Sequence, residues 1–138
     1  MILLGAMLAK GRPTFRLVKD WRYGVGYYPR FDVAITHTSL EFLEIIEREL
    51  MQQSINCSIR PSRSSGSHIL TIRASGDVDR LLSWIKQSPG SDIWFKVGKW
   101  KTFDEAYEMY QNDEHKTQEG IDKMLRLKGR LKGGIQNE

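Results

Sequence analysis

The chain has 138 residues, a length typical of one domain with its own hydrophobic core. Its residues are 40% hydrophobic and 28% charged, with a net charge of +4, which excludes a chain that is disordered throughout. The single cysteine, Cys57, excludes an internal disulfide and a cysteine-based metal site, and it indicates a reducing compartment such as the cytoplasm.

The N-terminal segment predicts a helix over residues 2–10, which Gly11 ends. The apolar run at residues 1–9 has no basic leader and is too short to span a bilayer. We therefore expect no association with a membrane.

Small residues on this helix predict a close contact with a second helix. Gly5 and Ala9 are four residues apart and share one face, and apolar side chains surround them. We expect a homodimer, since so apolar a helix needs a partner on most of its sides. A core helix within one monomer is the alternative. The residues expected at the dimer contact are Leu4, Gly5, Leu8 and Ala9.

Alternation of apolar and polar residues predicts two pairs of strands. The first pair is RPTFRLVK and RFDVAITH, joined by the glycine-containing turn DWRYGVGYYP. The second pair is NCSIRPS and HILTIRA, joined by RSSGS. Between the pairs, THTSLEFLEIIERELMQQ predicts a helix that begins with a capping box formed by Thr38 and Glu41.

Three more helices are predicted after the strands. The first is DVDRLLSWIKQ, and the others cover residues 102–112 and 117–132, with Thr102 and Thr117 as N-caps. No linker interrupts the chain, so we expect one domain over residues 1–138, with a core at 1–100 and C-terminal helices at 101–132. The order of elements predicts an α+β fold in which helices cover one face of an antiparallel sheet.

All four predicted strands have one apolar face and one open, polar face. The apolar face carries Phe15, Leu17, Phe31, Val33, Ile35, Cys57, Ile59, Leu70 and Ile72. The residues of the open face that we expect to contact a ligand are Arg12, Thr14, Arg16, Arg30, Asp32, Ser58, Arg60, Thr71 and Arg73.

Charge is distributed unequally between strands and helices. Residues 12–36 and 56–74 contain eight basic residues and two acidic ones, whereas residues 38–52 and 103–114 contain nine acidic residues and one basic one. A basic sheet backed by acidic helices predicts a polyanion as partner. Arginines and short polar side chains suit the phosphates and base edges of a DNA major groove. An ordinary solvated sheet face is the alternative.

The nonapeptide LLGAMLAKG resembles the motif of the LAGLIDADG homing endonuclease family, which Leu3, Gly5, Ala9 and Gly11 match. The predicted order of helices and strands is similar to the αββαββα core of that family. The segment at residues 114–131 resembles the family's C-terminal segment. Its matching residues are His115, Thr117, Glu119, Gly120, Ile121, Leu127 and Lys128.

The resemblance implies a saddle-shaped sheet in the major groove of double-stranded DNA, and a homodimer formed through the first helix. It also implies metal-dependent cleavage by an acid at the eighth motif position. Here that position is Lys10, and Leu8 replaces the other aspartate. An ammonium group cannot coordinate Mg²⁺, so we expect no catalytic and no metal-binding residue. Lys10 would bind phosphate instead, together with Lys99, which resembles a basic residue of the family.

Three functions remain open. The first is a sequence-specific DNA-binding homodimer, derived from a homing endonuclease, that no longer cleaves and acts as a transcriptional regulator. The second is an active endonuclease that uses Mg²⁺ and a displaced acid, for which Asp20 and Asp32 are the strand-region candidates. The third is an RNA-binding protein, either maturase-like or ribosome-associated. Whether the chain is an enzyme stays open, and Lys10 in place of the metal-binding acid argues against it. The expected location is the cytoplasm, at the nucleoid in a prokaryote.

Overall fold

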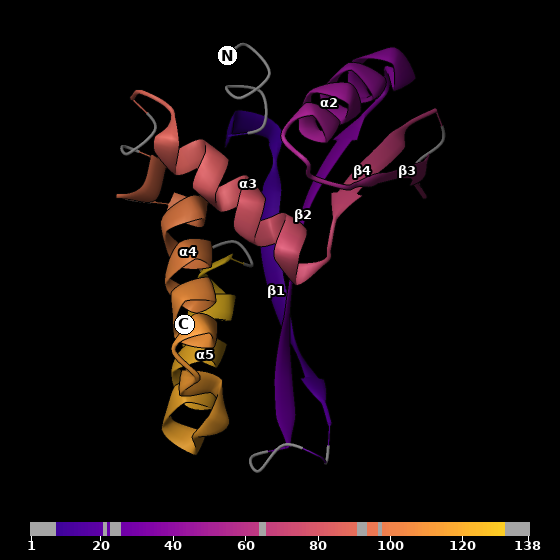
Figure 1. Cartoon of the computed structure of the whole chain (residues 1–138). Helices are drawn as coiled ribbons and strands as arrows, with labels where there is room; N and C mark the ends of the chain where they lie inside the picture. Colours follow the sequence, from indigo (N-terminus) through magenta and orange to yellow (C-terminus); the bar gives the residue numbers. More distant parts are fainter. Residues whose placement is uncertain are drawn as a thin grey trace. The chain divides into compact units, whose positions relative to one another are not determined.

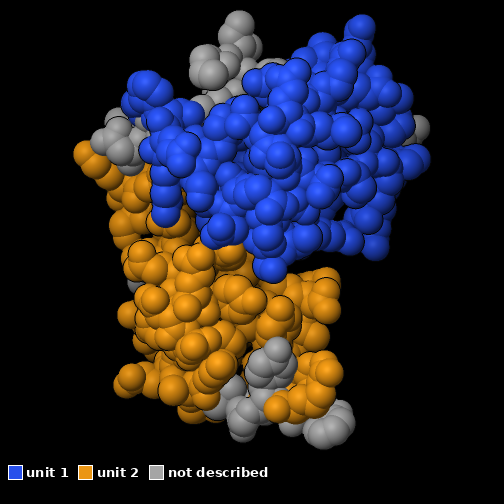
Figure 2. All heavy atoms as spheres, viewed as in Figure 1, with its two compact units in different colours: residues 1–13, 32–91 blue, residues 14–31, 92–138 orange. Residues whose placement is uncertain are grey.

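The computed structural model describes residues 8–20, 22, 26–63, 66–90, 94–96 and 98–131. These form two compact units (Figure 2), unit 1 from residues 1–13 and 32–91, and unit 2 from residues 14–31 and 92–138. Two strands pass from one unit to the other, so neither unit is a continuous piece of the chain. The single domain with a core at 1–100 and C-terminal helices at 101–132 stays a prediction.

The described strands form one sheet in the order β1-β2-β4-β3 (Figure 1). The strands are β1 Arg12–Lys19, β2 Tyr27–His37, β3 Ser58–Pro61 and β4 His68–Ile72. The helices are α2 Leu40–Gln52, α3 Ser75–Gln87, α4 Gly98–Gln111 and α5 Gln118–Leu131, with the 3-10 helix η2 at Glu114–Lys116. Both β2 and β3 pair antiparallel with β4. This order confirms the predicted α+β class and the two strand pairs separated by a helix.

The predicted N-terminal helix lies largely outside the described residues. Residues 8–10 are helical, as expected, and residues 1–7 are not described. Leu8 is buried, whereas Ala9 and Lys10 are exposed.

Unit 1 has an aliphatic core. Alternate residues of β2 and β4 face this core, and Val33, Ile35, Leu70 and Ile72 are completely buried. The helices add apolar side chains at helical spacing, and α2 packs against β4. The buried residues of α2 and α3 are Leu43, Ile46, Leu50, Asp77, Val78, Leu81, Leu82 and Ile85.

The start of α2 differs from the predicted capping box. The N-cap is Ser39, whose Oγ accepts a hydrogen bond of 3.1 Å from the backbone N–H of Phe42. The backbone N–H of Ser39 donates to Nδ1 of His37 at 2.9 Å, so the observed N-cap residue is bonded by His37 and not by Glu41. The prediction of Thr38 and Glu41 as a capping box is therefore wrong.

A buried carboxylate ties the start of α3 to the segment between α2 and β3. Asp77 is 5% exposed, and its Oδ1 accepts hydrogen bonds from the backbone N–H of Asn56 at 2.9 Å and from Nη2 of Arg80 at 2.8 Å. Arg80 also donates from Nε to the carbonyl oxygen of Ser54 at 2.8 Å. Ser54 has a φ of 62°, so these bonds hold a segment that turns through the left-handed region.

Unit 2 has an aromatic core centred on Phe31 of β2. The ring of Phe31 lies 5.4 Å from Phe15 of β1, 5.6 Å from Phe103, 5.1 Å from Tyr107 and 5.6 Å from Tyr110, measured between ring centroids. Such ring pairs stabilise a core beyond the area that they bury. They hold the β1–β2 residues of this unit against α4.

The two C-terminal helices begin differently from one another. Helix α4 begins at Gly98, and Thr102 lies inside it, 8% exposed, with Oγ1 donating to the carbonyl oxygen of Gly98 at 3.3 Å. The prediction of Thr102 as an N-cap is wrong. Buried residues follow one another at helical spacing from Trp100 onward, so the helix begins before Thr102. Thr117 is confirmed as a capping residue of α5, since its Oγ1 accepts from the backbone N–H of Gly120 at 3.0 Å.

Candidate nucleic-acid interface

The open face of the sheet in unit 1 carries exposed basic and hydroxyl side chains. In β1 and β2 they alternate with buried residues, as the sequence pattern predicts, whereas β3 has no buried residue and the last three residues of β4 are all buried. Across the β1–β2 pair, Nη2 of Arg12 donates a hydrogen bond of 2.8 Å to Oγ1 of Thr36. Asp32 on the same face is half-buried. The exposed residues are Arg12, Thr36, Ser58, Arg60 and Arg73.

Unit 2 continues the pattern along the same strands. Thr14 and Arg16 of β1 and Arg30 of β2 are exposed, while Phe15 and Phe31 between them are buried at 3% and 6%. These arginine side chains can each donate several hydrogen bonds to phosphates or base edges. The structure therefore exposes eight of the nine predicted contact residues fully or in part, and their contact with a ligand stays a prediction.

Thr71 is the exception, because it is only 5% exposed. It lies on β4 between Ala34 of β2 and Ser58 of β3, and its Oγ1 is buried with no hydrogen-bond partner among the described residues. Strands β2 and β3 flank β4 on both sides. The expectation that Thr71 reaches a ligand from the open face is wrong.

Ile69 is a residue of the open face that the sequence reading missed. It is partly exposed and lies between Thr36 and Arg60 in the strand register. The signal was present in the alternation itself: with Leu70 and Ile72 on the buried face, Ile69 has to lie on the other.

The residues at the metal-binding position of the resembled motif do not fit a divalent cation. Lys10 carries an ammonium group where a carboxylate would be needed, and it is exposed. In the described part of the chain, no group of three or more His, Cys, Asp or Glu side chains could hold a metal ion. Lys10 itself therefore cannot serve as a metal ligand at this position.

The two acids considered as replacements differ in their surroundings. Asp20 accepts hydrogen bonds from Arg22, at 2.9 Å from Nε to Oδ1 and at 2.7 Å from Nη2 to Oδ2, and these bonds lower the pKa of Asp20 to about 2. Both carboxylate oxygens of Asp20 are thus occupied by a guanidinium group. Asp32 remains the stronger candidate of the two, on the open face of unit 1.

The other predicted site residues are only partly described. Leu4 and Gly5 of the expected dimer contact lie outside the described residues. Lys99, near the start of α4, is half-buried. Burial raises the pKa of the Cys57 thiol to about 11, with Glu47 and Asp77 adding to the shift, so this cysteine is a poor nucleophile.

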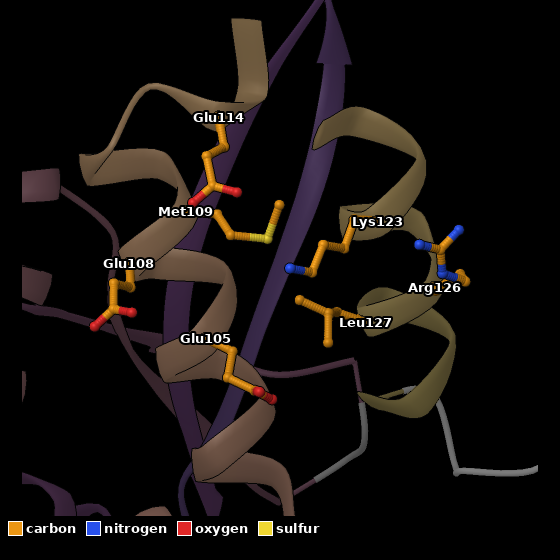
Figure 3. Close-up of a pocket in the computed structure, with 7 residues that line it drawn as sticks. All are labelled: Glu105, Glu108, Met109, Glu114, Lys123, Arg126 and Leu127. Carbon is orange, nitrogen blue, oxygen red and sulfur yellow. The ribbon is translucent and has the colours of Figure 1, made fainter. Parts of the chain in front are cut away.

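A hollow of about 310 Å³ lies in unit 2 between α4, η2 and α5 (Figure 3). Met109 and Leu127 line it together with charged side chains, and Lys123 points from α5 toward α4. The three carboxylates that line it would repel phosphates, so this hollow is not part of the candidate interface. The charged lining residues are Glu105, Glu108, Glu114, Lys123 and Arg126.

None of the helices in the described ranges has the length and apolar character needed to cross a bilayer.

No family model matches the sequence, and no curated protein matches it. Solved structures do match. The chain is similar over 98% of its length to "I-SmaMI bound to uncleaved DNA target in the presence of Calcium ions", with a TM-score of 0.72 and 20% identity, and covers 45% of that chain. It is similar over 99% to the archaeal intron-encoded homing endonuclease I-Vdi141I complexed with DNA, with a TM-score of 0.75 and 18% identity, and covers 84% of that chain.

A third similar structure is the LAGLIDADG meganuclease I-CpaMI bound to uncleaved DNA, with a TM-score of 0.71, 19% identity, and coverage of 98% of this chain and 46% of the other. The chain thus spans less than half the length of I-SmaMI and I-CpaMI. These likenesses confirm the predicted fold class: the chain has the fold of the LAGLIDADG homing endonucleases.

Proposed function

We propose that this chain binds double-stranded DNA with sequence specificity, through the open face of its sheet, as a homodimer that no longer cleaves DNA. The observation that carries the proposal is the alternation, along β1 and β2, of buried apolar residues with exposed arginines, together with exposed arginines on β3 and directly after β4. Those arginines are Arg12, Arg16, Arg30, Arg60 and Arg73.

The chemistry of this face suits a major groove. Arginine presents a planar fork of donors that matches the acceptors of guanine and the oxygens of a phosphate. Ser58 and Thr14 add exposed hydroxyl groups, which serve as donors or acceptors. Residues 38–52 and 103–114 carry nine acidic residues and one basic one, a charge opposite to that of the sheet, which favours approach of DNA to the sheet.

The small residues Gly5 and Ala9 support the homodimer, because they share one face of the predicted first helix and allow close approach of a second one. Ala9 is exposed, whereas Leu8 is buried in the single chain. The proposed contact therefore consists of Leu4, Gly5 and Ala9.

The loss of cleavage rests on Lys10. In a symmetric pair of chains, two ammonium groups would lie where the resembled motif has two carboxylates. They would bind phosphates and could not hold a metal. A protein that recognises a DNA site without cutting it fits the role of a transcriptional regulator, which we include in the proposal.

Asp32 supports the second candidate, an active endonuclease with a displaced acid, because it lies on the open face of unit 1 and is not fully buried. The single mid-strand carboxylate would have to bind Mg²⁺ in a unit whose exposed cations include Lys10, Arg12, Arg60 and Arg73, and positive charge disfavours a metal cation there.

The test is selection of bound duplexes from a random DNA pool, repeated with Mg²⁺ and with Mn²⁺. We expect one preferred duplex sequence, bound in preference to structured RNA and intact after incubation with either metal. Strand breaks that the Asp32→Asn variant abolishes would establish the endonuclease instead. Preference for the RNA would establish the RNA-binding alternative.

Replacement of Arg16 should relax the sequence preference. Arg16→Ala removes a guanidinium fork from the open face of unit 2, and we expect a loss of about 1–3 kcal/mol in discrimination at the base that it contacts. Comparison of dissociation constants for the selected duplex and its single-base variants measures this loss. The control is Arg48→Ala, which removes an exposed arginine from the acidic helix α2 and should change none of these constants. Equal effects of the two substitutions would contradict the assignment of Arg16.

A further inference from the structure

The strand register builds one row of side chains across all four strands in unit 1. Thr36 of β2 and Arg60 of β3 both pair with Ile69 of β4. Arg12 of β1 joins the row by its hydrogen bond of 2.8 Å to Oγ1 of Thr36. The row therefore runs Arg12, Thr36, Ile69, Arg60 across the open face.

Ile69 is the one large aliphatic side chain in this row. The next residue of the strand, Leu70, is completely buried on the other face, while Ile69 keeps part of its surface exposed. The neighbouring row consists of the small side chains Ala34, Thr71 and Ser58. Ile69 is therefore larger than the side chains of the neighbouring row, and it lies on a face that is otherwise rich in arginine and hydroxyl groups.

The width of the row suits a major groove. Strands lie about 4.8 Å apart, so a row across four strands spans ~14 Å, and the groove is ~12 Å wide. When the strands run along the groove, the outer residues Arg12 and Arg60 lie at its walls, near the phosphates. The inner residues Thr36 and Ile69 then lie over the base edges.

Only one base presents an apolar group in the major groove, namely thymine with its 5-methyl group. Resting on the proposed function, we infer that Ile69 reads the methyl group of a thymine in the target duplex. Thr36 completes the reading of the same base pair. Its Oγ1 accepts from Arg12, so its own O–H remains to donate to O4 of the thymine or to N7 of the adenine.

The test replaces each thymine of the selected duplex by deoxyuridine, one at a time. This change removes a methyl group and leaves the Watson–Crick pairing intact. We expect one position in each half-site at which the full-length chain binds about fourfold more weakly, the value of one buried methyl group. Fluorescence anisotropy with labelled duplexes gives the dissociation constants.

The Ile69→Ala variant should bind the thymine and deoxyuridine duplexes equally at that position. Ile69→Thr, which keeps a β-branched residue in the strand, should also lose most of the difference, and it serves if the alanine variant does not fold. Ile45→Ala is the control, since it shortens an exposed isoleucine on α2 and should keep the fourfold effect.

Two results would overturn the inference alone. One is a normal affinity of the wild-type chain for every deoxyuridine duplex, and the other is a fourfold effect that persists in both Ile69 variants. Failure of the wild-type chain to select any duplex would overturn the proposed function as well. The two failures are thus distinguishable.

Discussion

Affinity for the selected duplex falls by about a thousandfold or more when monovalent salt is raised from 50 to 200 mM, as expected of six or more phosphate contacts. Each copy of the chain exposes four arginines on its sheet strands and Arg73 directly after β4, and Lys10 adds a sixth cation. Two copies reach the six contacts required even when half of these groups read bases. The physical cause is release of counterions from the DNA as each phosphate is neutralised.

Titration by fluorescence anisotropy over a series of salt concentrations measures the slope of log affinity against log salt. The loss of one phosphate contact in each copy, as in Lys10→Ala, should reduce the slope by about 1.8 in a homodimer. Arg48→Ala on α2 should leave the slope unchanged, because this arginine lies outside the open face. A slope near zero for the wild-type chain would contradict binding through the arginines of the sheet.

The strand faces were predictable because alternation is a local property of the backbone. Phe15, Val33, Ile35, Leu70 and Ile72 are buried where the sequence places them. The failure at Thr71 has a different origin. Alternation gives the face of a residue but not its exposure: Ile69 and Thr71 lie on the same face of the central strand β4, yet Ile69 is partly exposed and Thr71 is buried.

Helix starts were less predictable, since several threonines and serines competed for the same role. Thr38 and Ser39 are adjacent, and the choice between them is made by His37, which accepts the backbone N–H of Ser39. For α4, the capping signal of Thr102 was weaker than the apolar spacing that begins with Trp100. In both cases a side-chain contact decided the boundary, and no propensity encodes that contact.

The role of His115 also emerges only from the structure. In the sequence, His115 is one of the residues that match the resembled C-terminal segment, and no physical reason for a histidine there is apparent from the sequence. It is 3% exposed and its ring centroid lies 5.0 Å from that of Tyr110 in α4. Burial is the main cause of a lowered pKa for His115, so the neutral form packs in unit 2.

Gly120→Ala should destabilise the protein strongly, although alanine is normally the better helix residue. A Cβ at position 120 would overlap the backbone carbonyl of Glu114, and backbone atoms cannot move aside as a flexible side chain can. Helix α5 would have to shift away from η2, which disturbs the cap at Thr117 and the packing of His115. We expect a loss of about 3 kcal/mol, the upper end of what an overpacked interior costs.

The matched control lies in the same helix. Gly129 has nothing within 4 Å of the Cβ position among the described residues, so Gly129→Ala should raise stability by about 0.5–1 kcal/mol. Urea denaturation of the three proteins at one protein concentration, followed by circular dichroism, gives both free-energy differences. Equal stability of the two variants would show that η2 and α5 do not approach as closely as Gly120 requires. Opposite signs would show that α5 needs glycine at position 120 because of its contact with η2, and that position 129 carries no such constraint.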